Sequence, residues 1–375
     1  MERQVFIDWL RAIAVGLVLF FHVGMMFVTW GWHIQNDATI PGLEWIMDLL
    51  HRVRMPLLFV IAGAVAMFSL RQRGVGRYIG ERARRLLLPV VFGMFVIVPP
   101  QIYWERVFHG DWSGDFAHFY VQRVLQFVPY PAGDFSWHHL WFIVYLFVFV
   151  LLLAPLFKAM HRWQLPQAGS YVLLFGLPLG LIEMVLRPRF PETHTLIGDW
   201  YLLGLYGALF LLGAVLTRVP QLFEWAARER HRLASGVLAV IVVATLGKRI
   251  WWPQWWDALV ANLFVWLAIL AALGYAKQHL RREGPALDYV RELSYPVYIL
   301  HQTVIVGVGM WVLPHVWPAV VKFAVALVVS TAATLAIYEL VVRRIAFLRV
   351  MFGLPYRPRA SRPKNISAPV AAANL

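Results

Sequence analysis

Long apolar runs separated by short polar segments recur along the whole chain. A helix that spans a membrane needs about 20 predominantly apolar residues. The pattern predicts ten such helices, over residues 8–30, 44–70, 86–104, 138–157, 169–187, 199–216, 233–248, 256–276, 294–313 and 318–341. We therefore expect an all-α, polytopic integral membrane protein. Residues 1–345 should form the transmembrane domain, and residues 346–375 a basic, flexible cytoplasmic tail.

Composition agrees with this class. Hydrophobic residues make up 60% of the chain and charged residues 14%, against roughly 45–50% and 25% in soluble domains. The first apolar stretch is long, begins with an acid and an arginine, and lacks the small-residue cleavage site of a signal peptide. The absence of cysteine excludes disulfides, thiolate metal sites and a cysteine nucleophile.

The net charge of +14 first suggests a nucleic-acid partner, but its distribution indicates topology instead. Most Lys and Arg residues fall in segments 71–85, 217–232 and 277–293 and in the tail after residue 342. Such segments stay in the cytoplasm under the positive-inside rule. An even number of spans then places both termini in the cytoplasm. We expect no nucleic acid among the partners.

The first predicted helix carries three polar side chains, Asp8, Arg11 and His22, which share one face at about 100° per residue. A charge in the bilayer costs roughly 2.5–3.5 kcal/mol, so it usually faces a protein interior or a wet cavity. Asp8 and Arg11 could form a helix-end ion pair or belong to a site. His22, near mid-span, could be a packing residue or a proton acceptor, because imidazole titrates near neutral pH.

The second predicted helix should place an arginine and a histidine below the outer membrane surface. Its apolar run, 55–70, is about 24 Å long at 1.5 Å per residue, shorter than a hydrocarbon core of about 30 Å. Arg54 and His51 should therefore lie inside the membrane, at a depth near that of His22. Arg54 could reach the outer headgroups or act as an anion partner in a cavity.

Two later helices carry further polar residues. Ser294, Tyr298 and His301 form one stripe of the ninth predicted helix, which suits either a polar helix contact or a site. The fourth predicted helix opens with His138, His139 and Trp141 at the outer surface. These three could be membrane-belt residues or acceptor-site residues. No spacing typical of a zinc site, such as HExxH, is present, so we expect no bound metal.

Tryptophan is abundant, with 18 residues, and most lie in predicted outer segments. A membrane belt should populate both surfaces, so the asymmetry indicates either an uneven belt or rings that stack on sugars. The candidate tryptophans for stacking on sugars are Trp104, Trp112, Trp137, Trp251, Trp252, Trp255 and Trp256.

Glu183 is a lone acid in the outer part of the fifth predicted helix.

Five motifs in order resemble the membrane acyltransferase 3 family, over about residues 5–345. One departure is Ala62, where the family usually has serine before the glycine. The motifs are Arg11 with ten residues before His22, Arg54 with an apolar run ending in Ala62-Gly63, the basic stretch 78–89 with Arg82 and Arg85, HLWF at 139–142, and SYPVYILH at 294–301.

Within the family, the N-terminal FxDxxRA, GWH at 31–33, LLHRVRM at 49–55 and HHLWF at 138–142 are similar to the glucan-biosynthesis protein C branch. Members of that branch are implicated in succinylating osmoregulated periplasmic glucans. The resemblance implies an O-acyltransferase of the bacterial inner membrane. Its donor would be cytoplasmic acyl-CoA, with succinyl-CoA favoured over acetyl-CoA, and its acceptor a hydroxyl of a periplasmic glycan. No permanently bound cofactor is implied.

The resemblance also implies roles. His22 would be the general base, Arg54 would stabilise the oxyanion or a succinyl carboxylate, and Asp8 and Arg11 would position the first helix or guide the donor. The donor-binding candidates are Tyr78, Arg82, Arg85, Tyr298 and His301. The acceptor-binding candidates are His51, Trp137, His139, Trp141 and Glu183.

Two other functions remain open from the residues alone. A proton-coupled or anion transporter could use Asp8, Arg11, His22 and Arg54 as its path, although the chain has no visible internal repeat of the kind common in transporters. The other open function is that of a scaffold subunit in a glycan-export complex. Membrane lipid is an expected partner in each case, and the oligomeric state is left open.

Overall fold

The computed structural model describes residues 5–71, 73–165, 169–247 and 254–356, and their regular elements are all helices. The α-helices are α1 (Val5–Gly24), α2 (Leu43–Leu70), α3 (Val75–Phe92), α4 (Val98–Phe108), α5 (Phe116–Gln122), α6 (Trp141–Met160), α7 (Gly176–Leu186), α8 (Trp200–Arg218), α9 (Gln221–Gly247), α10 (Gln254–His279), α11 (Pro285–Val312), α12 (Ala319–Ile337) and α13 (Ala346–Met351). Short 3₁₀ or π segments are η1 (Met25–Phe27), η2 (Gly93–Ile97), η3 (Val124–Gln126), η4 (His138–Leu140), η5 (Ser170–Phe175) and η6 (Tyr338–Val342).

Within the described residues, nine helical segments are long and apolar enough to cross a membrane. They correspond to nine of the ten predicted spans. The predicted fifth span coincides with a shorter apolar helical segment, Ser170–Leu186. The all-α, multi-pass class is thus confirmed. Helices α9 and α12 are largely exposed along their apolar lengths, as expected for surfaces that contact lipid.

Several segments predicted as cytoplasmic loops are helical, which corrects those boundaries. Helix α3 begins at Val75 and runs through most of the basic segment 71–85. Helix α9 likewise includes much of the segment 217–232. Arginine is a good helix former, so a helix can continue past the apolar run into water. The hydrophobic pattern therefore indicates how much of a helix lies in lipid, and it does not indicate where the helix begins or ends.

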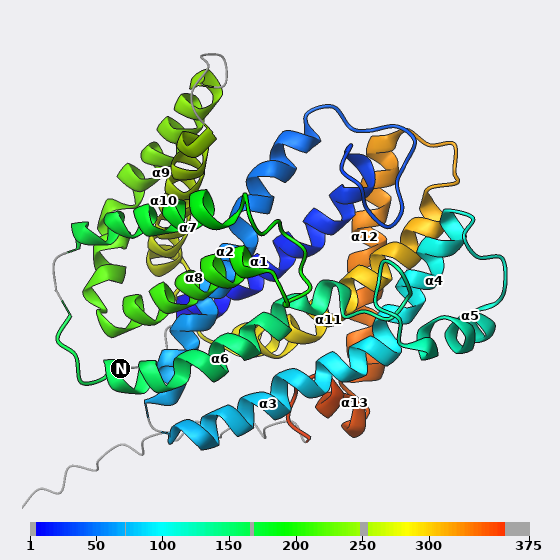
Figure 1. Cartoon of the computed structure of the whole chain (residues 1–375), viewed down its shortest axis with the longest axis horizontal. Helices are drawn as coiled ribbons and strands as arrows, with labels where there is room; N and C mark the ends of the chain where they lie inside the picture. The colour runs from blue at the N-terminus through cyan, green and yellow to red at the C-terminus, as the bar shows by residue number, and fades with distance from the viewer. Residues whose placement is uncertain (1–4, 72, 166–168, 248–253, 357–375) are drawn as a thin grey trace, which may run out of the picture.

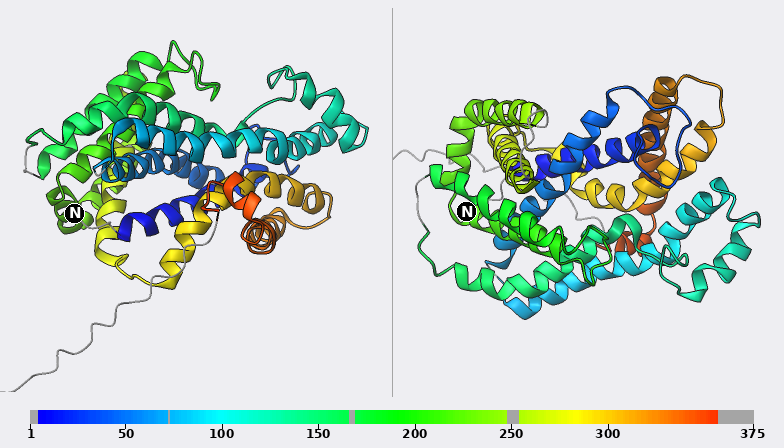
Figure 2. Two further views of the ribbon diagram at one scale, coloured as in Figure 1. Left: turned by 90° about the horizontal axis from the view of Figure 1, so that it is seen from below. Right: turned by 45° about the horizontal axis from the view of Figure 1, so that its top comes forward.

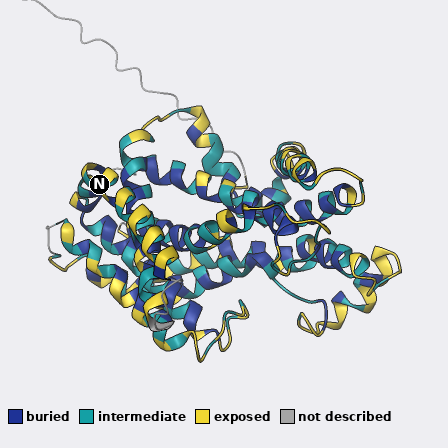
Figure 3. Cartoon of the chain, turned by 90° about the horizontal axis from the view of Figure 1, so that it is seen from above, coloured by how far each residue is buried: buried dark blue, intermediate teal, exposed yellow. Residues whose placement is uncertain are grey.

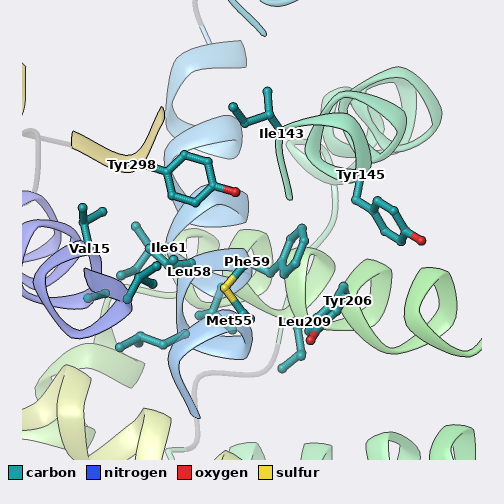
Figure 4. Close-up of a cluster of buried hydrophobic side chains, with 14 of the residues drawn as sticks. Val15, Met55, Leu58, Phe59, Ile61, Ile143, Tyr145, Tyr206, Leu209 and Tyr298 are labelled. Carbon is teal, nitrogen blue, oxygen red and sulfur yellow. The ribbon is translucent and has the colours of Figure 1, made fainter. Parts of the chain in front are cut away.

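The helices cross in a layered bundle (Figures 1 and 2). Helix α2 packs along α8, α1 along α11, and α9 along α10 as a hairpin at one end, while α4 and α5 lie at the other. Figure 3 shows buried residues concentrated in the middle of the molecule. The core around α2 contains Phe59, which stacks on Tyr206 with ring centroids 4.4 Å apart, near Met55 and Tyr298 (Figure 4).

Two glycines allow α2 and α8 to touch backbone to backbone. A Cβ atom added at Gly63 would lie 1.8 Å from the Phe210 carbonyl oxygen, and one at Gly213 would lie 1.9 Å from the Val60 oxygen. Small residues permit this close approach between membrane helices. The glycine of the Ala62-Gly63 motif therefore has a packing role in this protein.

We expect Gly63→Ala to lower the free energy of unfolding by about 1–3 kcal/mol. The reason is that the new methyl group would clash with the backbone of Phe210, which cannot move aside easily. The measurement is the thermal unfolding midpoint and the yield of monodisperse protein in detergent. Gly16→Ala is the matched control: Gly16 is also within a membrane helix, but a Cβ there meets nothing within 4 Å. Equal midpoints for the two variants would contradict the packing role.

The predicted cytoplasmic tail begins with an ordered segment. Helix α13 packs against α3, and the Arg349 guanidinium, which is 2% exposed, pairs with the Glu292 carboxylate at 2.8 Å. Residues 357–375 of the predicted tail lie outside the described residues.

Candidate active site

A pair of histidines joins α1 to α11. The His301 Nε2 atom lies 3.0 Å from His22 Nδ1, and His301 Nδ1 lies 2.6 Å from the Tyr298 carbonyl oxygen. Because a carbonyl only accepts, His301 Nδ1 carries the proton and its Nε2 has a lone pair in the neutral ring. His22 Nδ1–H must then donate to His301, which leaves the lone pair on His22 Nε2. The pair thus fixes His22 in the tautomer that a general base needs.

The packing of α1 against α11 brings this pair together. His301 is buried, whereas His22 is partly accessible. Near the N-terminal end of α1 and in the first half of α11, the buried Asp8 carboxylate accepts from Arg291 Nε at 2.8 Å and lies 3.5 Å from Arg11 Nη2. Asp8 is fourteen residues before His22, about 21 Å along a helix. The structure therefore divides the four predicted intramembrane residues between two places.

Arg54 is buried near the histidine pair without a carboxylate at ion-pair distance among the described residues. Its guanidinium carbon lies 3.3 Å from the centroid of the Phe21 ring, next to His22 in sequence, and its Nη1 lies 3.2 Å from His51 Nδ1. Its Nε is buried with no hydrogen-bond partner. A buried cation left unpaired is costly, so the position suits a bound anion or a charge that develops during a reaction.

The η4 segment and α11 are tied together beside this pair. The Tyr298 hydroxyl donates to the His139 carbonyl oxygen, and His139 Nε2 donates to the Ile299 carbonyl oxygen at 2.8 Å. The His139 and His301 rings have centroids 5.2 Å apart. His139, Tyr298 and His301, predicted to bind different substrates, thus lie in one cluster with His22.

An aromatic and acidic group lies near the N-terminal ends of α6 and α8. Trp141 packs against His194 with centroids 4.3 Å apart, and Trp137 Nε1 donates to the His194 carbonyl oxygen at 3.0 Å. The His194 ring lies 3.1 Å from Glu192. Burial raises the pKa of the Glu192 carboxyl, but the hydrogen bond from His194 together with the charges of His194, His51 and Arg187 outweighs burial, so the pKa is lowered. Glu192 is therefore charged at neutral pH, and its field reaches His51 and Arg54.

The predicted donor-binding residues of α3 lie in the part of the chain predicted to be cytoplasmic. Tyr78 is buried, Arg82 lies over its ring at 5.1 Å and donates to Ser69 Oγ at 3.2 Å. Arg85 accepts from the Tyr295 hydroxyl through its carbonyl oxygen at 3.5 Å. On the same side, a cavity of about 490 Å³ opens between the ends of α2, α6 and α8. Its lining includes Arg71, Lys158 and Arg218.

The remaining predicted residues have structural partners elsewhere. Glu183 accepts from Asn262 at 2.6 Å and from Arg187 at 2.5 Å, which joins α7 to α10. Trp104 packs against Gly307, and Trp112 donates to the Gly114 carbonyl oxygen. Trp256 is 40% exposed at the start of α10. Trp251, Trp252 and the side chain of Trp255 lie outside the described residues.

The sequence alone assigned no role to Trp32 and His33, which lie next to the histidine pair. Trp32 stacks over His22, with centroids 6.2 Å apart and an angle of 24°. His33 contacts Gln302 at 2.8 Å and the Glu105 carboxylate. The spacing of Gln101 and Glu105, four residues apart on α4, could have indicated a polar stripe. Nothing in the sequence connects that stripe to His33.

Comparisons with known proteins give one family. A model of the acyltransferase domain matches residues 4–339. Proteins named "Glucans biosynthesis protein C" from Salmonella schwarzengrund and Salmonella typhimurium are 20% and 21% identical to this chain, over 96% of it and 97% of each relative. No solved structure matches. The family match covers nearly all of the helical bundle and both helices that carry the histidine pair, so this chain belongs to the acyltransferase 3 family and is a multi-pass membrane acyltransferase.

Proposed function

We propose that this protein transfers an acyl group, preferably succinyl, from cytoplasmic acyl-CoA to a hydroxyl of a periplasmic glycan, with His22 as the general base. The observation that carries the proposal is the His22–His301 pair, which leaves a lone pair on His22 Nε2 near the buried Arg54, whose Nε has no hydrogen-bond partner. A base can accept the proton of an attacking hydroxyl, and a buried cation can bind the carboxylate end of a succinyl group.

In the proposed reaction, the acceptor hydroxyl donates its proton to His22 Nε2 as its oxygen attacks the thioester carbonyl carbon. The tetrahedral intermediate then collapses with cleavage of the C–S bond. The protonated His22 returns its proton to the departing CoA sulfur, so the products are the glycan ester and free CoA. His301 accepts from His22 Nδ1 throughout and holds the ring in place, as the third member of a hydrolase triad does.

Arg54 favours a dicarboxylic acyl group. The succinyl chain ends in a carboxylate, and burying that charge without a partner would cost several kcal/mol. Arg54 is 8% exposed, and within the described residues its guanidinium contacts His51 and the Phe21 ring and no carboxylate. A charge-assisted hydrogen bond between the two removes both penalties. An acetyl group would leave the arginine uncompensated.

The charge distribution supports a cytoplasmic donor. The cavity bordered by Arg71, Lys158 and Arg218 lies at the same end as Arg82, where the positive-inside rule places the cytoplasm. Its volume of about 490 Å³ is in the range of ligand pockets. The phosphates of CoA are anionic, and arginine and lysine are their usual partners.

The proposed acceptor follows from the relatives. The name of these relatives concerns glucan biosynthesis. Trp137 and Trp141 form an aromatic group around His194, which we assign to the periplasmic side as a surface on which sugar rings stack. We place the protein in the bacterial inner membrane, where cytoplasmic CoA and a periplasmic glucan meet on opposite sides.

A reconstituted reaction tests the proposal. Purified protein in detergent is given succinyl-CoA and periplasmic glucan, and free CoA thiol and the mass of the glucan are followed. We expect CoA release that depends on glucan, together with a mass increase for each ester formed. No ester with any glucan and either acyl-CoA, combined with solute flux in proteoliposomes, would favour the transporter function instead.

In cells, we expect the periplasmic glucan of a deletion strain to lack an anionic ester. The measurement is the mass spectrum of purified glucan from the wild-type, deletion and complemented strains. Complementation with the chain should restore the ester. Unchanged glucan substituents, with an altered lipopolysaccharide or other surface sugar, would show that the acceptor is wrong while leaving the acyltransferase chemistry in place.

A further inference from the structure

Three potential metal ligands converge on the outer side of the bundle, apart from the histidine pair. His33 follows η1, Glu105 lies near the end of α4, and His138 begins η4. One ligand atom from each lies within 4.8 Å of the others. Glu105 is 5% exposed and His33 is largely buried. We propose that these three residues bind a divalent transition-metal ion, with Zn²⁺ as the best match.

His138 provides the first argument. Both of its ring nitrogens are buried and have no hydrogen-bond partner. A buried polar group without a partner typically costs about 1–3 kcal/mol. A metal ion at one nitrogen would remove much of that cost.

The backbone at His138 provides a second, independent argument. Its φ of 41° lies in the left-handed region, which is uncommon for a residue with a side chain. The conformation is held by a hydrogen bond from the His138 amide to Ser136 Oγ at 3.0 Å. The ring stacks on that of His33, with centroids 5.1 Å apart and an angle of 26° between the planes. Such strain often occurs where a side chain is held for a function.

Supporting contacts around the other two ligands fit a metal site. The Tyr130 hydroxyl donates to Glu105 Oε1 at 2.8 Å, which orients the carboxylate and leaves Oε2 beside His33 Nδ1. The amide groups of Gln101 and Gln302 lie 3.0 and 2.8 Å from His33 Nε2. A metal-bound imidazole usually donates its second N–H to an oxygen, and rotation of either amide presents one.

The charges nearby permit a cation. Arg106 follows Glu105 in sequence, but its guanidinium is paired with the buried Asp134 carboxylate at 2.8 Å. The Asp134 carboxylate also accepts from Arg123 at 2.5 Å. Glu105 therefore remains the negative group that faces His33 and His138.

The donor set identifies the class of ion. Two imidazole nitrogens and one carboxylate match Zn²⁺ sites that keep a fourth position open. Ca²⁺ and Mg²⁺ prefer oxygen ligands alone. An ion bound by these three residues would link the segment after η1, the end of α4 and η4. It would thereby hold these three segments in place near the His22–His301 pair. Its binding does not depend on the acyl-transfer proposal.

Metal content tests the site directly. The full-length protein is purified in detergent through a tag without histidine, equilibrated with ZnCl₂, desalted and measured by inductively coupled plasma mass spectrometry. We expect about one Zn²⁺ per chain. His138→Ala and Glu105→Gln should each bind Zn²⁺ at least about tenfold more weakly. The control is His118→Ala, because His118 is exposed and paired with Asp115 at 2.7 Å.

A second measurement uses the wild-type protein and does not depend on the folding of variants. Binding to the folded state should raise the thermal unfolding midpoint as Zn²⁺ increases, and Co²⁺ in its place should give visible ligand-field absorption. Wild-type protein that retains no Zn²⁺ and shows neither effect would overturn the proposal, and His33 and Glu105 would be a metal-free pair. Equal Zn²⁺ in wild type and both cluster variants would place the metal elsewhere.

Discussion

Replacing His22 with alanine is expected to lower acyl transfer by about 100- to 10,000-fold, the usual contribution of a general base. The reason is geometric. His22 Nδ1 donates to His301 Nε2, because His301 Nδ1 is committed to the Tyr298 carbonyl oxygen. His22 Nε2 is therefore the nitrogen left with a lone pair. The measurement is the rate of CoA release with succinyl-CoA and glucan, at matched amounts of monodisperse protein.

Two further variants separate chemistry from packing. The amide nitrogen of His22→Asn takes the place of Nδ1 and can still donate to His301, so this variant should fold normally and be as inactive as alanine. His231→Ala is the control, since His231 contacts Tyr275 on α9 and α10, away from the pair. Full activity in either His22 variant would show that another residue takes the proton.

His301 is expected to act by positioning His22. His301→Ala should reduce the rate less than His22→Ala does, because the base remains but loses its fixed tautomer. His301→Gln can offer an oxygen to His22 Nδ1–H and should recover part of the activity. Such rescue would not follow if His301 served only to fill space. Equal rates for the alanine and glutamine variants would contradict the positioning role.

Replacing Arg54 with glutamine is expected to change which donor the protein uses. A hydrogen bond to a charged group contributes about 1.5–3 kcal/mol, which corresponds to a loss of about 10- to 150-fold with succinyl-CoA. Transfer from acetyl-CoA should change little, because acetyl has no carboxylate for the guanidinium. The ratio of kcat/KM for the two donors, measured on the same preparations, is the quantity to compare.

The neighbouring arginine gives a matched control. Arg52 precedes Arg54 by two positions along α2. Its Nε pairs with Asp48 at 3.1 Å, and 36% of its side chain is exposed. Arg52→Gln should leave the donor ratio unchanged. If Arg54→Gln lowers transfer from both donors equally, Arg54 stabilises the oxyanion and does not select succinyl. That result would leave the general-base assignment intact.

Sequence patterns were sufficient for the membrane class and for His22 and Arg54 as candidates, because a charge inside an apolar run is visible in a single chain. They were less reliable for helix length. Helices α3 and α9 continue into basic segments that were predicted to be loops, since hydropathy reports transfer into lipid and not hydrogen bonding along the backbone. They also did not anticipate the packing partners of Glu183 on α7 and α10.

The sequence by itself determined that this is a helical membrane protein with an intramembrane histidine and arginine, because transfer free energies are local and add along the chain. Only the tertiary structure decided that His22 has a partner 279 positions away, that Arg54 lies on Phe21, and that His33, Glu105 and His138 converge. The physical reason is rotation and packing of the helices. Backbone contacts such as that at Gly63 set which faces meet, and only then is the tautomer of a histidine fixed.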